Sequence, residues 1–189
     1  MAEAILFYIV GPSGSGKDSL LRYARAHLAG DPEVVFAHRY ITRPVELHGE
    51  NHVTLTEAEF DARLGAGLFA MHWESHGLRY GIGLEIHLWL ARGCHVVVNG
   101  SRAYLQQARN RYPELAAVWV EVSADVLEAR LRARGRENAA QIVARVARAA
   151  QFRPDGDDAY VVRNDGALEQ GGKQLLDLIN ARRGATSCA

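Results

Sequence analysis

An apolar run, a glycine-rich loop and a helical pattern follow one another at the start of the chain, and this succession constrains the fold most. Residues 4–10 predict a buried strand, and residues 18–28 predict a helix with one apolar side. Between them, Gly-Pro-Ser-Gly-Ser-Gly-Lys at 11–17 has the spacing of a phosphate-binding P-loop. Glycines let several backbone N–H groups point at one phosphate, and the helix N-terminus and Lys17 add positive charge. A plain glycine-rich turn would leave Lys17 without a purpose, so the stretch predicts a phosphate site.

Composition restricts the class of protein further. In 189 residues the 22 basic and 22 acidic side chains cancel, which argues against nucleic acid or an anionic membrane as the main partner. The first ten residues lack the basic start of a signal peptide, and no apolar run is long enough to cross a bilayer. Cys94 and Cys188 are too few for a disulfide framework, so a reducing cytoplasm is the expected compartment. Lys17 and Lys173 are the only lysines beside many arginines, which supports a dedicated role for Lys17.

Apolar strands alternate with amphipathic helices along the rest of the chain. Further strands are predicted at 34–37, 95–98, 117–122 and 159–162, and helices at 84–91, 101–111, 124–134, 139–150 and 168–181. This alternation predicts an α/β P-loop kinase fold with a mostly parallel five-stranded sheet flanked by helices.

The alternation is interrupted between about 39 and 83. A helix is predicted at 56–64 and two short strands at 69–73 and 78–80, which together indicate a small inserted lobe. We therefore expect a single domain over 1–189, with its core at 1–38 and 84–189 and an acceptor-binding lobe at 39–83.

Hydroxyl residues precede several of the predicted helices. Thr56, with Glu59 three residues later, predicts a capping box. Ser101 and Ser123 are predicted to cap the two helices that follow them. The side chains expected to face inward from the helix at 139–150 are Ile142, Val143 and Val146.

Arginines are concentrated between about 130 and 148. The cluster comprises Arg130, Arg132, Arg134, Arg136, Arg145 and Arg148. Two arginine-rich helices joined through Gly135 predict a lid over transferring phosphates, because guanidinium groups neutralise the charge of the transferring group. The alternative is a solvated basic face paired with Glu128 and Glu137.

A second phosphate-binding group is predicted at the start of the lobe. Arg43 lies between Thr42 and Pro44, so an extended bend presents its guanidinium. Together with Arg39 it would bind a phosphate-bearing substrate opposite the P-loop, whereas an ordinary surface loop is the alternative.

Further polar residues are candidates for acceptor contacts. His72 and His76 are four apart, but no third metal ligand is evident, so acceptor binding or packing is favoured over a metal. Asn99 and Ser101 follow a buried strand, at the edge where open α/β sheets bind ligands. For Ser101, acceptor binding and helix capping are equally favoured.

Together these motifs resemble the guanylate kinase superfamily over nearly the whole chain. The matching segments are 11–17, Thr42-Arg43-Pro44, Gly49-Glu50, Tyr80-Gly81, the arginine lid and Asn164-Asp165. The residues that read guanine in that superfamily are replaced here, by His52, His72, Ile82 and Asn99. Because a guanine site needs matched polar groups, the acceptor is expected to be phosphorylated but not a guanine nucleotide.

A closer resemblance is to the ribose 1,5-bisphosphate phosphokinases of bacterial phosphonate breakdown. It rests on Gly-Lys-Asp-Ser at 16–19, Gly-Glu-Asn-His at 49–52, His72-Trp73, Gly-Leu-Arg-Tyr-Gly-Ile at 77–82 and Val-Asn-Gly-Ser-Arg at 98–102. The resemblance implies phosphorylation of ribose 1,5-bisphosphate by ATP, giving 5-phosphoribosyl 1-diphosphate and ADP. The alternatives are a guanylate or nucleoside monophosphate kinase and, less in keeping with Lys17, a non-catalytic protein-binding module.

The residues and the resemblance together predict the composition of the site. The catalytic residues are expected to be Lys17, Arg43, Arg134 and Arg145. ATP is expected to contact Gly11, Pro12, Ser13, Gly14, Ser15, Gly16, Lys17, Asp18, Ser19, Arg130, Arg134 and Asn164. The acceptor is expected to contact Arg39, Arg43, Glu50, His52, His72, Tyr80, Asn99 and Ser101.

A magnesium ion is expected between the phosphates and the chain. Asp18 stands where P-loops usually carry a Ser or Thr that contacts Mg²⁺, so Asp18 and Ser19 are the predicted ligands. The alternative is that Asp18 binds no metal and its carboxylate only stabilises the positive N-terminal end of the helix. No nucleic acid or membrane partner is expected, and the oligomeric state is open, a homodimer included.

Overall fold

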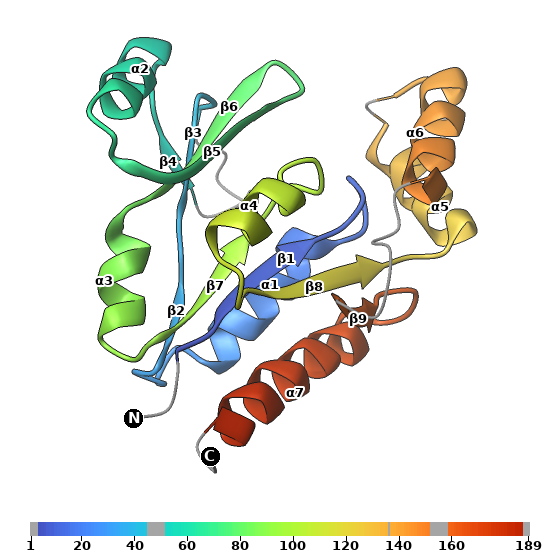
Figure 1. Cartoon of the computed structure of the whole chain (residues 1–189). Coiled ribbons are helices and arrows are strands. Elements are labelled where there is room, and N and C mark those ends of the chain that lie inside the picture. The colour runs from blue at the N-terminus through green and yellow to red at the C-terminus, as the bar shows by residue number, and fades with distance from the viewer. Residues whose placement is uncertain (1–3, 45–51, 136, 152–158, 187–189) are drawn as a thin grey trace.

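Two β-sheets organise the molecule (Figure 1). The computed structural model describes residues 4–44, 52–135, 137–151 and 159–186. The larger sheet is parallel throughout and has the strand order β2-β7-β1-β8-β9. Its strands are β1 (Leu6–Val10), β2 (Val34–Phe36), β7 (His95–Asn99), β8 (Ala116–Glu121) and β9 (Ala159–Arg163). The predicted five-stranded parallel sheet is therefore confirmed, and β1 lies at its centre.

Helices cover both faces of this sheet because its strands are apolar on both sides. From β1, Phe7 and Ile9 pack with Leu20 of α1 (Lys17–His27) and Leu175 of α7 (Leu168–Thr186). Leu6, Tyr8 and Val10 face the opposite cluster, which receives α3 (Glu85–Ala91) and α4 (Leu105–Arg111). No helix among the described residues is long and apolar enough to cross a membrane.

The smaller sheet has the order β4-β3-β6-β5. Its elements are β3 (Arg39–Ile41), β4 (His52–Thr54), α2 (Glu57–Gly65), β5 (Phe69–Ser75) and β6 (Leu78–Gly83). β3 pairs with β4 in parallel and with β6 antiparallel. The strands β3 and β4 were not predicted, because they are not apolar runs and three residues are too few to show alternation.

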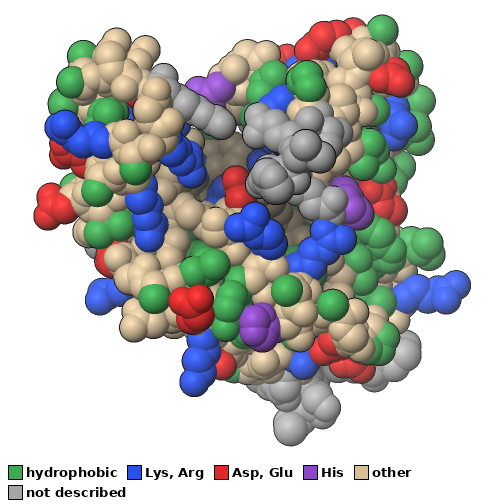
Figure 2. All heavy atoms as spheres, turned by 180° about the vertical axis from the view of Figure 1, so that it is seen from behind, with side chains coloured by type: hydrophobic (Ala, Val, Ile, Leu, Met, Phe, Trp, Pro, Cys, Tyr) green, Lys and Arg blue, Asp and Glu red, His purple; other side chains and the backbone are tan. Residues whose placement is uncertain are grey.

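A helical hairpin faces this lobe across the P-loop end of β1 (Figure 1). It consists of α5 (Ala124–Arg134) and α6 (Ala139–Gln151), held by Leu127, Leu131 and Ile142. The prediction that Val143 faces inward is wrong, since its side chain is 64% exposed. The buried stripe of α6 runs through Ile142 and Val146, and Val143 lies beside it. Between the lobe and the hairpin the surface is hollowed (Figure 2).

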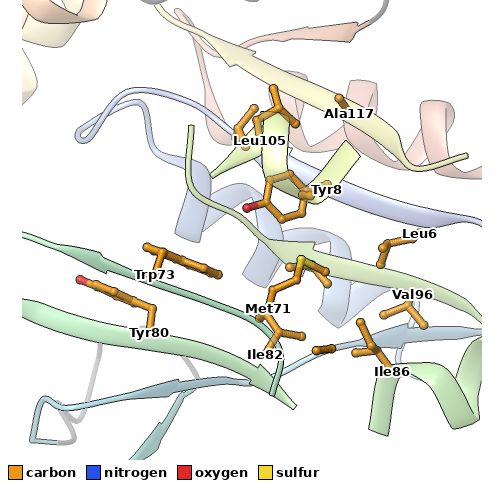
Figure 3. Close-up of a cluster of buried hydrophobic side chains, with 14 of the residues drawn as sticks. Leu6, Tyr8, Met71, Trp73, Tyr80, Ile82, Ile86, Val96, Leu105 and Ala117 are labelled. Atoms are coloured by element: carbon orange, nitrogen blue, oxygen red, sulfur yellow. The ribbon is translucent and has the colours of Figure 1, made fainter. Parts of the chain in front are cut away.

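One apolar cluster joins the lobe to the main sheet (Figure 3). Met71 and Ile82, from two strands of the lobe, are fully buried together with Tyr8 of β1 and Val96 of β7. Such a shared core costs several kcal/mol to open, so it places the base of the lobe firmly against the sheet.

The N-terminal caps observed on the helices agree with the predicted caps only in part. The capping box of Thr56 is confirmed, because its hydroxyl accepts from Glu59 N at 3.2 Å and Glu59 Oε2 accepts from Thr56 N at 2.7 Å. The prediction that Ser101 caps a helix is wrong, since α4 begins only at Leu105. Ser101 N donates instead to the buried hydroxyl of Tyr8, at 3.0 Å. Ser123 stands before α5 but makes no side-chain cap.

A buried histidine predicts a specific pH dependence of stability. His95 is 5% exposed, and its Nδ1 accepts a hydrogen bond from Ile5 N, which requires the neutral ring. Burial, and then the charge of Arg183, lower the pKa of His95. The unfolded chain therefore binds more protons, so this contribution to stability is present above about pH 6.5 and is lost below it.

We expect the free energy of unfolding in urea to fall between about pH 7 and about pH 5, and to fall less in His95→Asn. The asparagine retains an acceptor for Ile5 N but does not titrate. An identical decline in both proteins would contradict this assignment.

Candidate active site

The P-loop is held from two directions through one carbonyl group. Asn164 Nδ2 donates to the carbonyl oxygen of Ser15 at 2.6 Å, and Arg130 Nη1 donates to the same oxygen at 3.2 Å. Gly14 and Gly16 have φ angles of 100° and 82°, the left-handed region that favours glycine. Asn164 and Arg130, both predicted to contact ATP, thus lie against the loop and fix its backbone.

Gly16→Ala tests this packing. A Cβ on Gly16 would lie 2.4 Å from Asn164 Nδ2 in a backbone conformation that alanine disfavours, so we expect about 1–3 kcal/mol of destabilisation and a loss of ATP binding. The control is Gly30→Ala, because nothing lies within 4 Å of a Cβ there. Thermal melting would measure the stability of the two variants, and titration with ATP would measure their affinity. Equal stability and equal ATP affinity in the two variants would contradict the strained geometry.

A cleft of about 440 Å³ opens above the P-loop between the lobe and the helical hairpin (Figure 2). Among the described residues that line it, six are basic and one is acidic. The basic residues are Lys17, Arg39, Arg43, Arg102, Arg134 and Arg148, and the acidic residue is Asp18. Since the whole chain has a formal net charge of zero, the positive charge is concentrated where an anionic ligand would bind.

Asp18 lies among these cations. Its side chain is 58% exposed, Lys17 Nζ lies 3.8 Å from Oδ1, and Asn99 Nδ2 donates to Oδ1 at 2.8 Å. Loss of water in the cleft raises the pKa of Asp18, but Lys17, Arg39, Arg134 and the bond from Asn99 lower it more. The carboxyl group is therefore an anion near neutral pH.

The oxygen donors present fit a magnesium ion. Asp18 and Ser19 both line the cleft beside the P-loop. Mg²⁺ is commonly bound by one or two protein oxygens together with substrate phosphates and water. Within the described ranges no three His, Cys, Asp or Glu residues form a metal-binding group.

One side of the cleft is built by the lobe. Arg39, Arg43 and Tyr80 line it, and the guanidinium of Arg39 lies 5.1 Å from the centre of the Tyr80 ring. His52 Nε2 donates to the carbonyl oxygen of Arg43 at 3.2 Å. His52 therefore supports the backbone that carries Arg43, while Glu50 lies outside the described residues.

The remaining acceptor candidates are divided between two sites. Ser101 lines the cleft, and Asn99 is buried behind it against Asp18. His76 also lines the cleft, from the tight turn between β5 and β6. His72 is exposed, on the face of β5 opposite Met71 and Trp73. It lines a neighbouring groove that Trp73 also borders.

The arginine-rich hairpin contacts the P-loop directly. Arg145 Nη2 donates to Ser13 Oγ at 2.5 Å, and the same guanidinium pairs with Glu137. Burial, and then the charges of Arg134 and Arg148, lower the pKa of Arg145. Arg134 lines the cleft, whereas Arg136 lies outside the described residues.

Seven of the residues that line the cleft were absent from the predicted catalytic and binding residues, although His76 and Arg148 had been named as members of wider clusters: Trp73, Ser75, His76, Gly100, Arg102, Ala103 and Arg148. Arg102 follows the Asn99–Ser101 segment and Arg148 lies one helical turn after Arg145, so both continue patterns visible in the sequence. Trp73 shares a face of β5 with Met71, and strand alternation indicates that face. No local pattern shows that these residues, distant in sequence, meet in one cleft.

Comparisons with known proteins agree with this geometry. No protein-family model matches the chain. The ribose 1,5-bisphosphate phosphokinase PhnN of Thiobacillus denitrificans is 66% identical over 180 residues, which cover 95% of each chain. The protein of that name from Desulfomicrobium baculatum is 53% identical over 174 residues, covering 92% of this chain and 93% of that one.

Among solved structures, the fold is similar to that of guanylate kinase from Anaplasma phagocytophilum. The TM-score is 0.71 at 14% sequence identity, and the match covers 97% of this chain and 88% of the other. At that identity the similarity shows the fold alone, which is guanylate kinase-like. From the close and nearly full-length sequence relatives it follows that this chain belongs to the ribose 1,5-bisphosphate phosphokinase family.

Proposed function

We propose that this protein transfers the γ-phosphoryl group of ATP to ribose 1,5-bisphosphate, giving 5-phosphoribosyl 1-diphosphate and ADP. The observation that carries the proposal is one cleft that is lined both by the P-loop and by two arginines of the lobe, Arg39 and Arg43. A kinase of a phosphorylated acceptor needs a polyanion site on each side of the transferred group. The proposed acceptor, ribose 1,5-bisphosphate, is the one that appears in the names of the relatives in the same family.

ATP is bound by the P-loop. Its backbone N–H groups surround the phosphates, and the ammonium of Lys17 offsets their charge. The bonds to Ser15 from Arg130 and Asn164 hold the loop in shape before ATP arrives. The cleft is therefore preorganised, which reduces the rearrangement needed during the reaction.

The acceptor phosphate is held by Arg43 and Arg39 in line with the γ-phosphoryl group. An oxygen of the 1-phosphate, already ionised at neutral pH, attacks the γ-phosphorus. A new P–O bond forms while the bond from the γ-phosphorus to the β–γ bridging oxygen breaks, and the electron pair stays on ADP. No general base is needed, so positioning and charge stabilisation supply the rate.

The helical hairpin supplies positive charge on the side of the cleft that neither the P-loop nor the lobe forms. Arg134 and Arg148 line the cleft, and Arg145 is held on the P-loop through Ser13. Guanidinium groups there offset the charge spread over the transferring oxygens. Asp18 and Ser19 would hold Mg²⁺, which would neutralise part of the negative charge of the ATP phosphates.

Asp18→Asn is expected to raise the Mg²⁺ concentration for half-maximal activity by about tenfold, because an amide is a weaker ligand than a carboxylate. Asp125→Asn is the matched control, since Asp125 is also acidic in the first turn of an 11-residue helix, α5. Titrating activity with Mg²⁺ separates the two variants. If the two variants lose only thermal stability and keep the wild-type Mg²⁺ dependence, Asp18 stabilises the N-terminus of its helix and does not bind the metal.

The reaction is tested by following its products by phosphorus NMR. With ATP, Mg²⁺ and ribose 1,5-bisphosphate, the signal of the 1-phosphate is expected to be replaced by two coupled diphosphate signals as ADP appears. ADP formed together with free phosphate and no sugar diphosphate would overturn the proposal.

We further propose that the partners are these two small molecules and that the enzyme acts in the cytoplasm. Cys94 is a free thiol, in keeping with a reducing compartment, and Cys188 lies outside the described residues.

A further inference from the structure

Trp73 separates two hollows of similar size. It lines the cleft of about 440 Å³ and also a groove of about 400 Å³ between the lobe and α4. Ala103, which begins the approach to α4, is shared by both linings. The indole therefore forms much of the wall between the acceptor side of the cleft and the groove.

This wall is held in place by aromatic packing (Figure 3). The Trp73 and Tyr80 rings are 5.6 Å apart and nearly parallel, at 3°, and Tyr104 lies 5.7 Å from Trp73 on another side. Trp73 and Tyr80 are each only 9% exposed. Because Arg39 stacks on Tyr80 at 5.1 Å, the wall is continuous with an arginine proposed to bind the acceptor phosphate.

Polar groups are present on the far side of the wall. The groove is lined by His72, Glu74, Arg79 and Gln107 beside the apolar Phe60 and Leu64. Such a mixture of donors, acceptors and apolar surface suits a flat heterocyclic base. With Trp73 in place, these groups are separated from a ligand whose phosphate lies at Arg39 and Arg43.

We propose that Trp73 is a specificity-determining residue that limits the acceptor to a compact sugar phosphate. The inference rests on the proposed function, since it concerns the acceptor half of the same cleft. The wall excludes the base of a nucleoside monophosphate by volume. Removing the indole would join the cleft to the groove. The base of a nucleoside monophosphate could then lie beside the polar side chains that line the groove.

The test compares Trp73→Ala with the control Trp73→Phe, which keeps an aromatic ring in the wall. For each protein, kcat/KM is measured with GMP and with ribose 1,5-bisphosphate. The ratio of the two values does not depend on the fraction of folded protein. We expect the GMP-to-sugar ratio to rise about tenfold or more in Trp73→Ala and to change little in Trp73→Phe.

Binding supplies a readout besides turnover. Titration calorimetry with GMP is expected to show tighter binding to Trp73→Ala than to the wild type or to Trp73→Phe. An unchanged ratio and unchanged GMP affinity in folded Trp73→Ala would overturn the inference, as would equal gains in both variants. If Trp73→Ala does not fold, Trp73→Leu replaces it, because leucine preserves apolar burial while shortening the wall.

Failure of the proposed function gives a different result. In that case the wild-type protein would not phosphorylate ribose 1,5-bisphosphate, whereas the GMP titrations would still report whether Trp73 closes the groove.

Discussion

Lys17→Ala is expected to lower kcat by about a thousandfold while the protein remains folded. Lys17 is the basic residue at the end of the P-loop, its side chain is 15% exposed, and it lines the cleft. In the proposed reaction its ammonium is the point charge placed among the ATP phosphates, so its loss would leave negative charge uncompensated in the transition state. Steady-state kinetics with circular dichroism melting would measure both effects.

The chain offers a matched control, since Lys173 is its only other lysine. Lys173 is exposed on α7, and Lys173→Ala is expected to retain wild-type kcat. Near-normal turnover in Lys17→Ala would contradict the assigned role of the P-loop. Loss of activity in both variants would point to a general effect of removing positive charge.

Arg43→Ala is expected to lower kcat/KM for the acceptor by about 100- to 1000-fold, with a much smaller change in KM for ATP. Arg43 reaches the cleft from the lobe, and His52 holds its backbone. In the proposed reaction the guanidinium both binds the acceptor phosphate and stabilises charge on it as the new bond forms. Varying each substrate in turn separates the two effects.

Arg63→Ala in the same lobe is the control. Arg63 lies over the ring of Tyr40, 5.0 Å from its centre, and is absent from the described lining of the cleft. We expect less than about threefold change in its acceptor kinetics. An Arg43→Ala variant with altered KM for ATP alone would place Arg43 on the donor side and contradict the proposed orientation.

Much of the fold was predictable because its signals are local. The P-loop requires a strand before it and a helix after it, and both occur, as β1 and α1. Strands β7, β8 and β9 are apolar runs between helical patterns, so their parallel arrangement followed from the alternation. The short strands β3 and β4 carry no such signal, because partner strands and not their own residues define them.

The position of a cleft residue was predictable where a local sequence motif fixes the backbone conformation around it. Lys17, Asp18 and Arg43 stand in such motifs, and all three line one cleft. His72 was assigned to the acceptor by its position in a motif, but strand alternation directs it toward the neighbouring groove. Arg148 stood in the predicted lid, whereas Arg102 and Trp73 come from separate elements that meet only in the folded chain, so spacing alone does not connect them.

The measurement that tests the account most directly is ADP release by the purified protein from ATP and Mg²⁺, with ribose 1,5-bisphosphate or GMP as acceptor. The account predicts rapid release with the sugar bisphosphate and little with GMP. Strong release with GMP and little with the sugar would contradict the proposed acceptor and identify a nucleoside monophosphate kinase. Release with neither acceptor would contradict the proposed phosphoryl transfer itself.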